Sequence, residues 1–287
     1  MKVLLLGANG QLGSALQKNR PQDVELIAYG RGDLDLADAG DIEARVAQSQ
    51  AQLVINAAAY TAVDKAEAEE ALAFAINAQS VGSVARAAQR MGARLVHVST
   101  DYVFDGTKGA PYLPDDPTAP LGVYGRSKRQ GELEALAGCQ DSLIVRTAWV
   151  YAEQGTNFVR TMLRLMAEKP ELRVIADQIG TPTYAASLAQ ALWKLAGTDA
   201  RGILHYTDSG VASWYDFACA IQEEALALGL LEKAVPVRPI ATADYPTAAK
   251  RPLFSILDKS QSWAVLGQPA MHWRTNLRTM LERLKNA

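Results

Sequence analysis

Short apolar runs recur along the first half of the chain and alternate with stretches of helical pattern. The apolar runs cover residues 3–6, 24–29, 53–56, 95–99 and 142–147. Such runs are typical of strands buried on both faces of a parallel sheet. Between them, helices are predicted at residues 12–18 and 41–48, and residues 66–90 predict one long helix or two shorter ones. This alternation predicts an α/β fold with a Rossmann-type, doubly wound parallel sheet.

The pattern loosens in the second half of the chain. Four helices are predicted there, at residues 158–167, 185–195, 213–227 and 273–284. We therefore expect residues 1–150 to form a dinucleotide-binding Rossmann domain, to which later segments can return. Residues 151–287 are expected to form most of a smaller, mixed α/β domain that binds the substrate.

A proline-rich stretch separates the last two of the predicted sheet strands. Residues 105–121 contain Pro111, Pro114, Pro117 and Pro120, a pattern that predicts a loop crossing the surface. Because the loop ends just before Tyr124, we expect it to be a lid or an edge of a functional site.

Composition narrows the class of protein. The chain has 287 residues, of which 49% are hydrophobic, enough for a large buried core. With 29 basic and 31 acidic residues the net charge is −2, so we expect no general attraction to nucleic acid or to an anionic membrane. No apolar run approaches membrane-spanning length, and the first residues have a strand pattern rather than that of a signal peptide. The two cysteines, Cys139 and Cys219, have no CxxC spacing, so a cytoplasmic protein with reduced thiols is expected.

A glycine-rich turn directly follows the first apolar run. The sequence GANGQLG at residues 7–13 has the spacing GxxGxxG, a variant of the dinucleotide fingerprint. Gly7 permits a tight turn out of the strand, Gly10 leaves room for a pyrophosphate, and Gly13 lets the helix pack close to the sheet. Because a helix N-terminus points free N–H groups at phosphates, this turn predicts a dinucleotide site.

The end of the second apolar run bears on which dinucleotide binds. An acidic residue there would hold the ribose hydroxyls of NAD, whereas an arginine accommodates the additional phosphate of NADP. Arg31 follows this run, which favours NADPH, but Asp33 and Asp35 come close behind it and leave NADH open.

Tyr124 and Lys128 are four residues apart, so they share one face if the segment is helical. Reduction of a carbonyl needs a proton donor at its oxygen. A phenol has a pKa of about 10, and a nearby ammonium lowers it. Thr100 ends the strand pattern before the proline-rich loop, so its hydroxyl is expected at the carboxyl edge of the sheet, where it can donate to a carbonyl. Together the three residues predict a carbonyl-reducing centre.

Metal catalysis finds no support in the sequence. The histidines are His97, His205 and His272, and none is paired at ligand spacing. His97 lies in a buried-strand pattern, so we expect it to be a core histidine with satisfied hydrogen bonds.

Several motifs resemble a known family in order and spacing over essentially the whole chain. The glycine turn, a Ser/Thr at a later strand end and YxxxK resemble the extended short-chain dehydrogenase/reductases, which act largely on nucleotide sugars. More specific stretches are VINAAAYTAVDKAE at 54–67, VSTDYVFDG at 98–106, PLGVYGRSK at 120–128, IVRTAWVY at 144–151, DQIGTPT at 177–183 and YPTAAKRP at 245–252. On these stretches the chain resembles the dTDP-4-dehydrorhamnose reductases.

The resemblance implies an oxidoreductase of dTDP-rhamnose and lipopolysaccharide biosynthesis that reduces dTDP-4-dehydro-L-rhamnose to dTDP-L-rhamnose with NADPH or NADH. It implies that Tyr124 donates the proton, that Lys128 holds the nicotinamide ribose and tunes Tyr124, and that Thr100 positions the sugar carbonyl. Positions that match the family on the cofactor side are Gly10, Gln11, Leu12, Asp35, Leu36, Ala59, Tyr60 and Thr61. Positions that match on the substrate side are Val63, Asp101, Trp149 and Arg251. A homodimer is common among relatives.

One departure separates this chain from some relatives. Nucleotide-sugar dehydratases carry a glutamate, the base for water elimination, where this chain has Tyr102, so reduction is favoured over dehydration. A 4-reductase or 4-epimerase for another nucleotide sugar stays open. A non-catalytic regulatory subunit that keeps the dinucleotide fold also stays open, although the set Thr100, Tyr124 and Lys128 argues against it.

Overall fold

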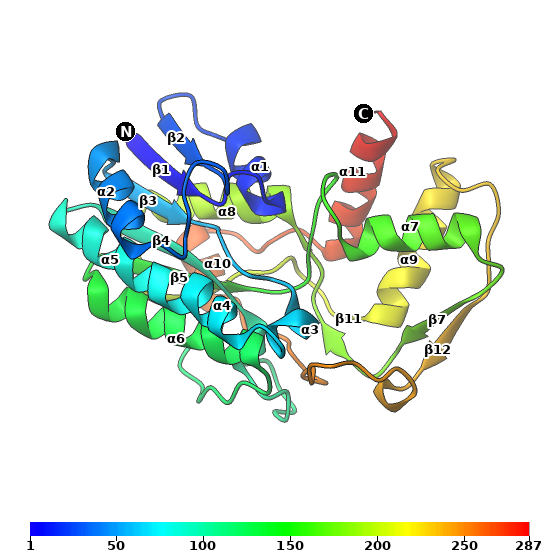
Figure 1. Cartoon of the computed structure of the whole chain (residues 1–287). Helices are drawn as coiled ribbons and strands as arrows, with labels where there is room; N and C mark the ends of the chain where they lie inside the picture. Colours follow the sequence, from blue (N-terminus) through cyan, green and yellow to red (C-terminus); the bar gives the residue numbers. More distant parts are fainter. Residues whose placement is uncertain (287) are drawn as a thin grey trace.

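The computed structural model describes residues 1–286, and a six-stranded parallel sheet forms the centre of its larger lobe (Figure 1). In spatial order the strands are β10 (Gly202–His205), β5 (Ser142–Thr147), β4 (Arg94–Thr100), β3 (Leu53–Asn56), β1 (Lys2–Leu6) and β2 (Glu25–Tyr29). Each neighbouring pair runs parallel. The chain order reverses direction between β1 and β3, which is where ligands bind in such sheets. The predicted α/β fold with a Rossmann-type, doubly wound sheet is confirmed.

Helices cover both faces of this sheet because successive strand residues point to opposite sides. In β1, Val3 and Leu5 point to one face, and Leu4 and Leu6 point to the other. The first face is covered by α1 (Gln11–Lys18) and α8 (Ala185–Ala196). The second face is covered by α2 (Ala39–Ser49), α5 (Ser80–Arg90) and α6 (Val123–Gly138).

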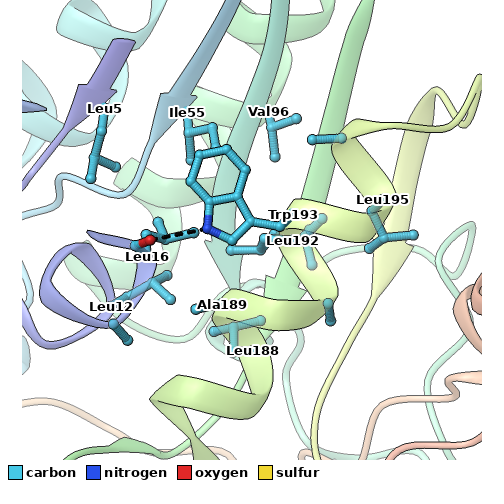
Figure 2. Packing of buried hydrophobic residues seen from close by; sticks show 14 of the residues in the cluster. Leu5, Leu12, Leu16, Ile55, Val96, Leu188, Ala189, Leu192, Trp193 and Leu195 are labelled. Carbon is cyan, nitrogen blue, oxygen red and sulfur yellow. Dashed lines mark hydrogen bonds between the residues drawn. The ribbon is translucent and has the colours of Figure 1, made fainter. Parts of the chain in front are cut away.

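Trp193 of α8 packs against the sheet and is hydrogen-bonded to α1. Its indole ring is 8% exposed and lies among Leu5, Ile55 and Val96 of three neighbouring strands (Figure 2). The indole Nε1 donates a hydrogen bond to the carbonyl oxygen of Leu16 at 3.0 Å. Helix α8 and strand β10, although they come from the second half of the chain, are thus built into the larger lobe.

The smaller lobe, within the described residues, is a bundle of helices with short strand pairs at its side (Figure 1). Its helices are α7 (Phe158–Glu168), α9 (Trp214–Ala227) and α11 (Trp273–Lys285). Its strand pairs are β7 (Leu172–Ile175) with β12 (Val237–Ile240), β6 (Val150–Tyr151) with β9 (Thr183–Tyr184), and β8 (Ile179–Gly180) with β11 (Ala212–Ser213). An apolar core around Phe217, Ile221 and Leu277 holds these elements together.

Some segments differ from the elements that the sequence pattern predicts. The stretch predicted as one or two helices is interrupted: α3 (Val63–Ala66) and α4 (Glu70–Phe74) lead into a π-helical turn, η1 (Ala75–Gln79), before α5. Strand β10 and helix α10 (Ser260–Leu266) were not predicted, because each is short and lacks a periodic pattern of its own.

The proline-rich loop is tied down rather than lying wholly on the surface. Phe104 and Tyr112 are buried and stack with ring centroids 4.1 Å apart. The backbone N–H of Tyr112 donates to the carbonyl oxygen of Ile256 at 2.8 Å. The loop is thus held in place by a buried aromatic stack. The four prolines predicted a surface loop and gave no indication of this stack.

We expect Trp193→Ala to lower the free energy of unfolding by about 3–5 kcal/mol, because it leaves a large cavity under α1. Trp193→Phe keeps most of the ring but loses the hydrogen bond to Leu16, so a loss of about 1–2 kcal/mol is expected. Urea unfolding followed by circular dichroism measures both. The control is Leu133→Ala on α6, where Leu133 is 44% exposed and a change below about 0.5 kcal/mol is expected. A Trp193→Ala loss no larger than that of the control would contradict this packing.

Candidate active site

A groove with a volume of about 590 Å³ runs along the carboxyl ends of the central strands. It lies where the strand order reverses, and the loops after β1, β2 and β3 and the strand end of β4 all reach it. The groove brings together nearly all residues predicted for the cofactor: Gly7, Gly10, Gln11, Leu12, Arg31, Asp35, Leu36, Ala59, Tyr60, Thr61, Tyr124 and Lys128. Gly13 is the exception, since it packs beneath the turn, where a Cβ atom would lie 2.1 Å from the carbonyl oxygen of Gly7.

The glycine turn has the shape that a pyrophosphate requires. Gly7 has a φ of +83°, and a Cβ atom there would lie 2.6 Å from the backbone nitrogen of Ala58, so no other residue fits without a shift. Gly10 is the N-cap of α1 in an extended conformation, and among the described residues no side chain caps this helix end. The first N–H groups of α1 are therefore left for an anion in the groove.

At the other end of the groove, a cation and a carboxylate line the wall after β2. Arg31 and Asp35 both belong to the lining and are exposed. Asp33, by contrast, lies outside the lining and turns its Oδ2 back to accept from the N–H of Gly30 at 2.8 Å. An additional ribose phosphate would therefore meet the guanidinium of Arg31 at this end.

Tyr124 lines the inner end of the groove, and Thr100 lies next to it, outside the groove lining. Tyr124 is half-buried on the first turn of α6, and Thr100 is the last residue of β4. Burial raises the pKa of Tyr124 to about 12, although a hydrogen bond with the Thr100 hydroxyl lowers this pKa and the charge of Asp101 raises it. The phenol is therefore protonated at neutral pH.

Lys128 lies one turn further along α6, and its ammonium is bonded to β4. Its Nζ donates to the carbonyl oxygen of Val98 at 2.7 Å and lies 3.3 Å from Nε2 of His97. Burial lowers the pKa of Lys128 to about 8, and the charge of Glu132 opposes this change. The predicted lowering of the Tyr124 pKa by Lys128 is wrong for this structure, because the ammonium is held by β4 instead.

His97 is buried as predicted, but its hydrogen bonds are not all satisfied. Its side chain is 0% exposed, and within the described residues Nδ1 has no hydrogen-bond partner. Burial, together with the charge of Lys128, holds the pKa of His97 well below its usual range. His97 is thus a neutral ring packed against the ammonium.

Asp101 is a buried carboxyl group beside the same end of the groove. Its Oδ1 accepts from the Thr100 hydroxyl at 2.9 Å, and its Oδ2 has no partner within the described residues. Burial raises the pKa of Asp101 to about 6, although hydrogen bonds with Ser255 and Thr100 lower it. At neutral pH the protein therefore carries a poorly solvated charge next to Thr100.

The remaining residues predicted for the substrate lie outside the lining of the groove. Arg251 donates from Nη1 and Nη2 to the two carboxylate oxygens of Asp64, at 3.1 and 2.7 Å. Val63 is the first residue of the short helix α3, which also carries Asp64. Trp149 has a positive φ of 48° and stacks on Trp214 of α9, with centroids 3.5 Å apart. The structure therefore brings Asp101 next to Thr100 and Tyr124, and places Trp149 with the smaller lobe.

Asn77 is a positioning residue that the sequence did not reveal. It is 0% exposed in the π-helical turn, and its amide holds the backbone of Tyr60 at both ends, with Oδ1 accepting at 2.8 Å and Nδ2 donating at 3.0 Å. The same Nδ2 donates to the hydroxyl of Ser127 on α6 at 3.0 Å. Asn77 therefore joins the loop beside the groove to the helix of Tyr124. The signal available in the sequence was an asparagine within the alanine-rich stretch AINAQ.

Gln11 of the glycine turn also binds the smaller lobe. Its Oε1 accepts from Nδ2 of Asn157 at 2.9 Å, and Asn157 is the N-cap of α7. The same Nδ2 donates to the carbonyl oxygen of Ala152 at 2.8 Å. The turn that lines the groove is therefore bonded to both lobes.

Two features are absent from residues 1–286. In this range, no group of three or more His, Cys, Asp or Glu side chains is arranged to hold a metal ion. None of the helices described there combines the length and the apolar character needed to cross a membrane.

The sheet topology, the glycine turn and the Thr100, Tyr124 and Lys128 set define an NAD(P)H-dependent oxidoreductase of the short-chain dehydrogenase/reductase class. The family model of the RmlD substrate binding domain matches residues 1–286. A dTDP-4-dehydrorhamnose reductase of Aggregatibacter actinomycetemcomitans is 42% identical, over 97% of this chain and 98% of its own. The chain belongs to the dTDP-4-dehydrorhamnose reductase family.

Solved structures of that family agree with this assignment. The dTDP-4-dehydrorhamnose reductase of Clostridium acetobutylicum is similar with a TM-score of 0.94 and 38% identity, over 99% of this chain and 100% of that chain. The enzyme of Bacillus anthracis in complex with NADP is similar with a TM-score of 0.92 and 37% identity, over 98% of this chain and 99% of that chain.

We expect Asp101→Asn to stabilise the protein at pH 7.5 by about 1–3 kcal/mol and to lose this advantage at pH 4. A carboxyl whose folded pKa is raised from about 3.9 to about 6 contributes stability below pH 4, and this contribution is lost as the pH rises through 6. Urea unfolding at both pH values measures the difference. Asp64→Asn is the control with the opposite sign, because its hydrogen bond with Arg251 lowers the pKa of Asp64. An Asp101→Asn advantage that is the same at both pH values would contradict the prediction.

Proposed function

We propose that the protein reduces dTDP-4-dehydro-L-rhamnose to dTDP-L-rhamnose with NADPH as the hydride donor. Membership of the dTDP-4-dehydrorhamnose reductase family supports this substrate, and the related Bacillus anthracis enzyme in complex with NADP supports the cofactor. The observation that carries the proposal is the groove, in which Tyr124 and Lys128 lie with the glycine turn while Thr100 is hydrogen-bonded to Tyr124.

The groove residues fit a nicotinamide dinucleotide. The glycine turn at Gly7 and the free N–H groups at the start of α1 would bind the pyrophosphate. Arg31 would bind a 2′-phosphate on the adenosine ribose. When bound, the cofactor supplies the hydride that adds to C4 of the sugar. Tyr60, Thr61 and Ala59 form the wall on the side where Asn77 fixes the backbone.

Tyr124 supplies the proton in this proposal. Its phenol is protonated at neutral pH, so it can donate to the carbonyl oxygen as that oxygen gains negative charge. The O–H bond of Tyr124 breaks, and a new O–H bond forms at the oxygen attached to C4 of the product. The phenolate of Tyr124 is later reprotonated from solvent. Thr100 holds the carbonyl oxygen of the sugar by a hydrogen bond, and Lys128, held by Val98, binds ribose hydroxyls of the cofactor.

The substrate is proposed to lie between the two lobes. Asp101, Val63 and Trp149 are proposed to contact the sugar, and Arg251 to contact the nucleotide diphosphate once it exchanges its partner Asp64. The proposed domains are residues 1–150 for the cofactor and 151–287 for most of the substrate contacts, with α8 and β10 counted with the first. We also propose that the protein is a homodimer and that it is located in the cytoplasm.

Tyr124→Phe tests the proton donor. We expect turnover of dTDP-4-dehydro-L-rhamnose to fall by about 10²- to 10⁴-fold while NADPH still binds, because only the transferable proton is lost. Turnover is followed by the loss of NADPH absorbance, and binding by NADPH fluorescence. Thr100→Val is the matched control, with a smaller loss expected because a donor but not the acid is removed.

The same assay separates the alternatives. A reductase oxidises one cofactor for each product, whereas an epimerase forms product without net oxidation of the cofactor. If the wild-type protein binds NADPH but does not oxidise it in the presence of any keto sugar tested, it is a regulatory subunit. Full turnover by Tyr124→Phe would show that another group is the acid.

Arg31→Ala tests the choice of cofactor. We expect it to weaken NADPH binding by about tenfold, equivalent to about 1.4 kcal/mol, and to leave NADH binding nearly unchanged, because only NADPH carries the additional phosphate. Arg31→Lys is the matched variant, with an intermediate loss expected since the charge stays but the paired N–H donors are removed. Equal losses for NADPH and NADH would remove Arg31 from the phosphate site.

A further inference from the structure

The helix of Tyr124 and Lys128 carries a buried ion pair one turn further on. Glu132 and Arg146 are 0% and 1% exposed, and Arg146 donates from Nε and Nη2 to the two carboxylate oxygens at 2.7 and 2.8 Å. Such a pair is weak evidence for stability, because removing both charges from water costs about as much as their attraction contributes. Its position next to Lys128 suggests a different role.

Glu132 on α6 is bonded to two strands beside the groove. The hydroxyl of Ser99, the residue before Thr100, donates to its Oε1 at 2.6 Å. Arg146 lies on β5 and donates from Nη1 to the carbonyl oxygen of Pro114 in the proline-rich loop, at 3.1 Å. Arg129 reaches Oε2 from the solvent side at 2.9 Å. The carboxylate thus links α6 to the ends of β4 and β5 where the reacting groups lie.

The charges around Lys128 are few. Its own helix presents Tyr124 and Glu132, and β4 presents His97, which is neutral. Strand β5 contributes Arg146, whose charge is bound to Glu132. The π-helical turn η1, which packs on α6, has the sequence AINAQ and carries no ionisable side chain. The short helix η2 (Asp101–Val103), which also packs on α6, carries Asp101, but the charge that raises the pKa of Lys128 is that of Glu132.

We propose that Glu132 and Arg146 are positioning residues for Lys128: the carboxylate favours the ammonium form of the buried lysine, and the guanidinium limits that effect. Residues i and i+4 of a helix are neighbours, so Glu132 acts on Lys128 along α6. The charge of Glu132 raises the pKa of Lys128 against the effect of burial, in agreement with this role. The inference rests on the proposed function, since Lys128 is the group proposed to bind the cofactor.

Opposite charge changes within the pair test the inference. NADPH binding, followed by fluorescence between pH 6 and pH 10, is expected to weaken as the pH rises and Lys128 loses its proton. Glu132→Gln keeps the shape but removes the anion, so the midpoint of this loss is expected to move down by roughly one pH unit. Arg146→Met leaves the anion without its partner, so the midpoint is expected to move up. The alkaline limb of the turnover profile is expected to move in the same directions.

A merely structural role predicts a different result. Loss of packing would lower the unfolding temperature of both variants without moving their midpoints in opposite directions, and that outcome would overturn the inference. The control is Arg129→Gln, which removes a half-exposed cation from the same carboxylate and is expected to move the midpoint by less than about 0.3 pH units.

A second variant covers the case in which a single substitution does not fold. Glu132→Leu with Arg146→Met replaces the whole pair by apolar groups, a change that buried pairs often tolerate. Its midpoint is expected below that of the wild type, and an unchanged midpoint would overturn the inference. A wild-type protein that fails to bind NADPH would refute the proposed function instead, so the two failures are distinguishable.

Discussion

The cost of burying one ammonium group governs the arrangement of the site. Lys128 is 2% exposed, and an unpaired cation in such a place is strongly disfavoured. The structure compensates with a carbonyl oxygen at 2.7 Å, a neutral imidazole ring and a carboxylate one turn away. Because β4 and α6 supply these groups, the two elements must meet in one register, and that register also brings Thr100 beside Tyr124.

Local patterns in the sequence were sufficient to predict the frame of the molecule. The apolar runs predicted the five strands from β1 to β5, because a strand buried on both faces is a nearly continuous apolar run. The glycine turn predicted the groove, because Gly7 follows β1 directly and its conformation excludes side chains. The residues predicted for the cofactor, apart from Gly13, line one continuous groove.

What the sequence could not predict depends on partners far apart in the chain. Asn77 is buried because it holds Tyr60 and Ser127, the latter fifty residues away. The stack of Trp149 on Trp214 joins residues 65 positions apart in the chain, and nothing near either residue in the sequence indicates the other. The pKa of Tyr124 was predicted with the wrong sign, since its spacing from Lys128 does not show which way the ammonium points.

The attachment of α8 by Trp193 has a consequence for folding order. A nascent chain that ends near residue 150 contains the glycine turn and five strands of the sheet, but neither the helix that covers α1 nor the edge strand β10. Its apolar face would then be exposed at Leu16 and Val96 until residues 185–205 have been synthesised. Residues 1–150 therefore lack part of the packing that covers their own sheet. The sheet is completed only by contacts between residues far apart in the sequence. Such contacts form slowly, so the apolar surface stays exposed for longer during synthesis.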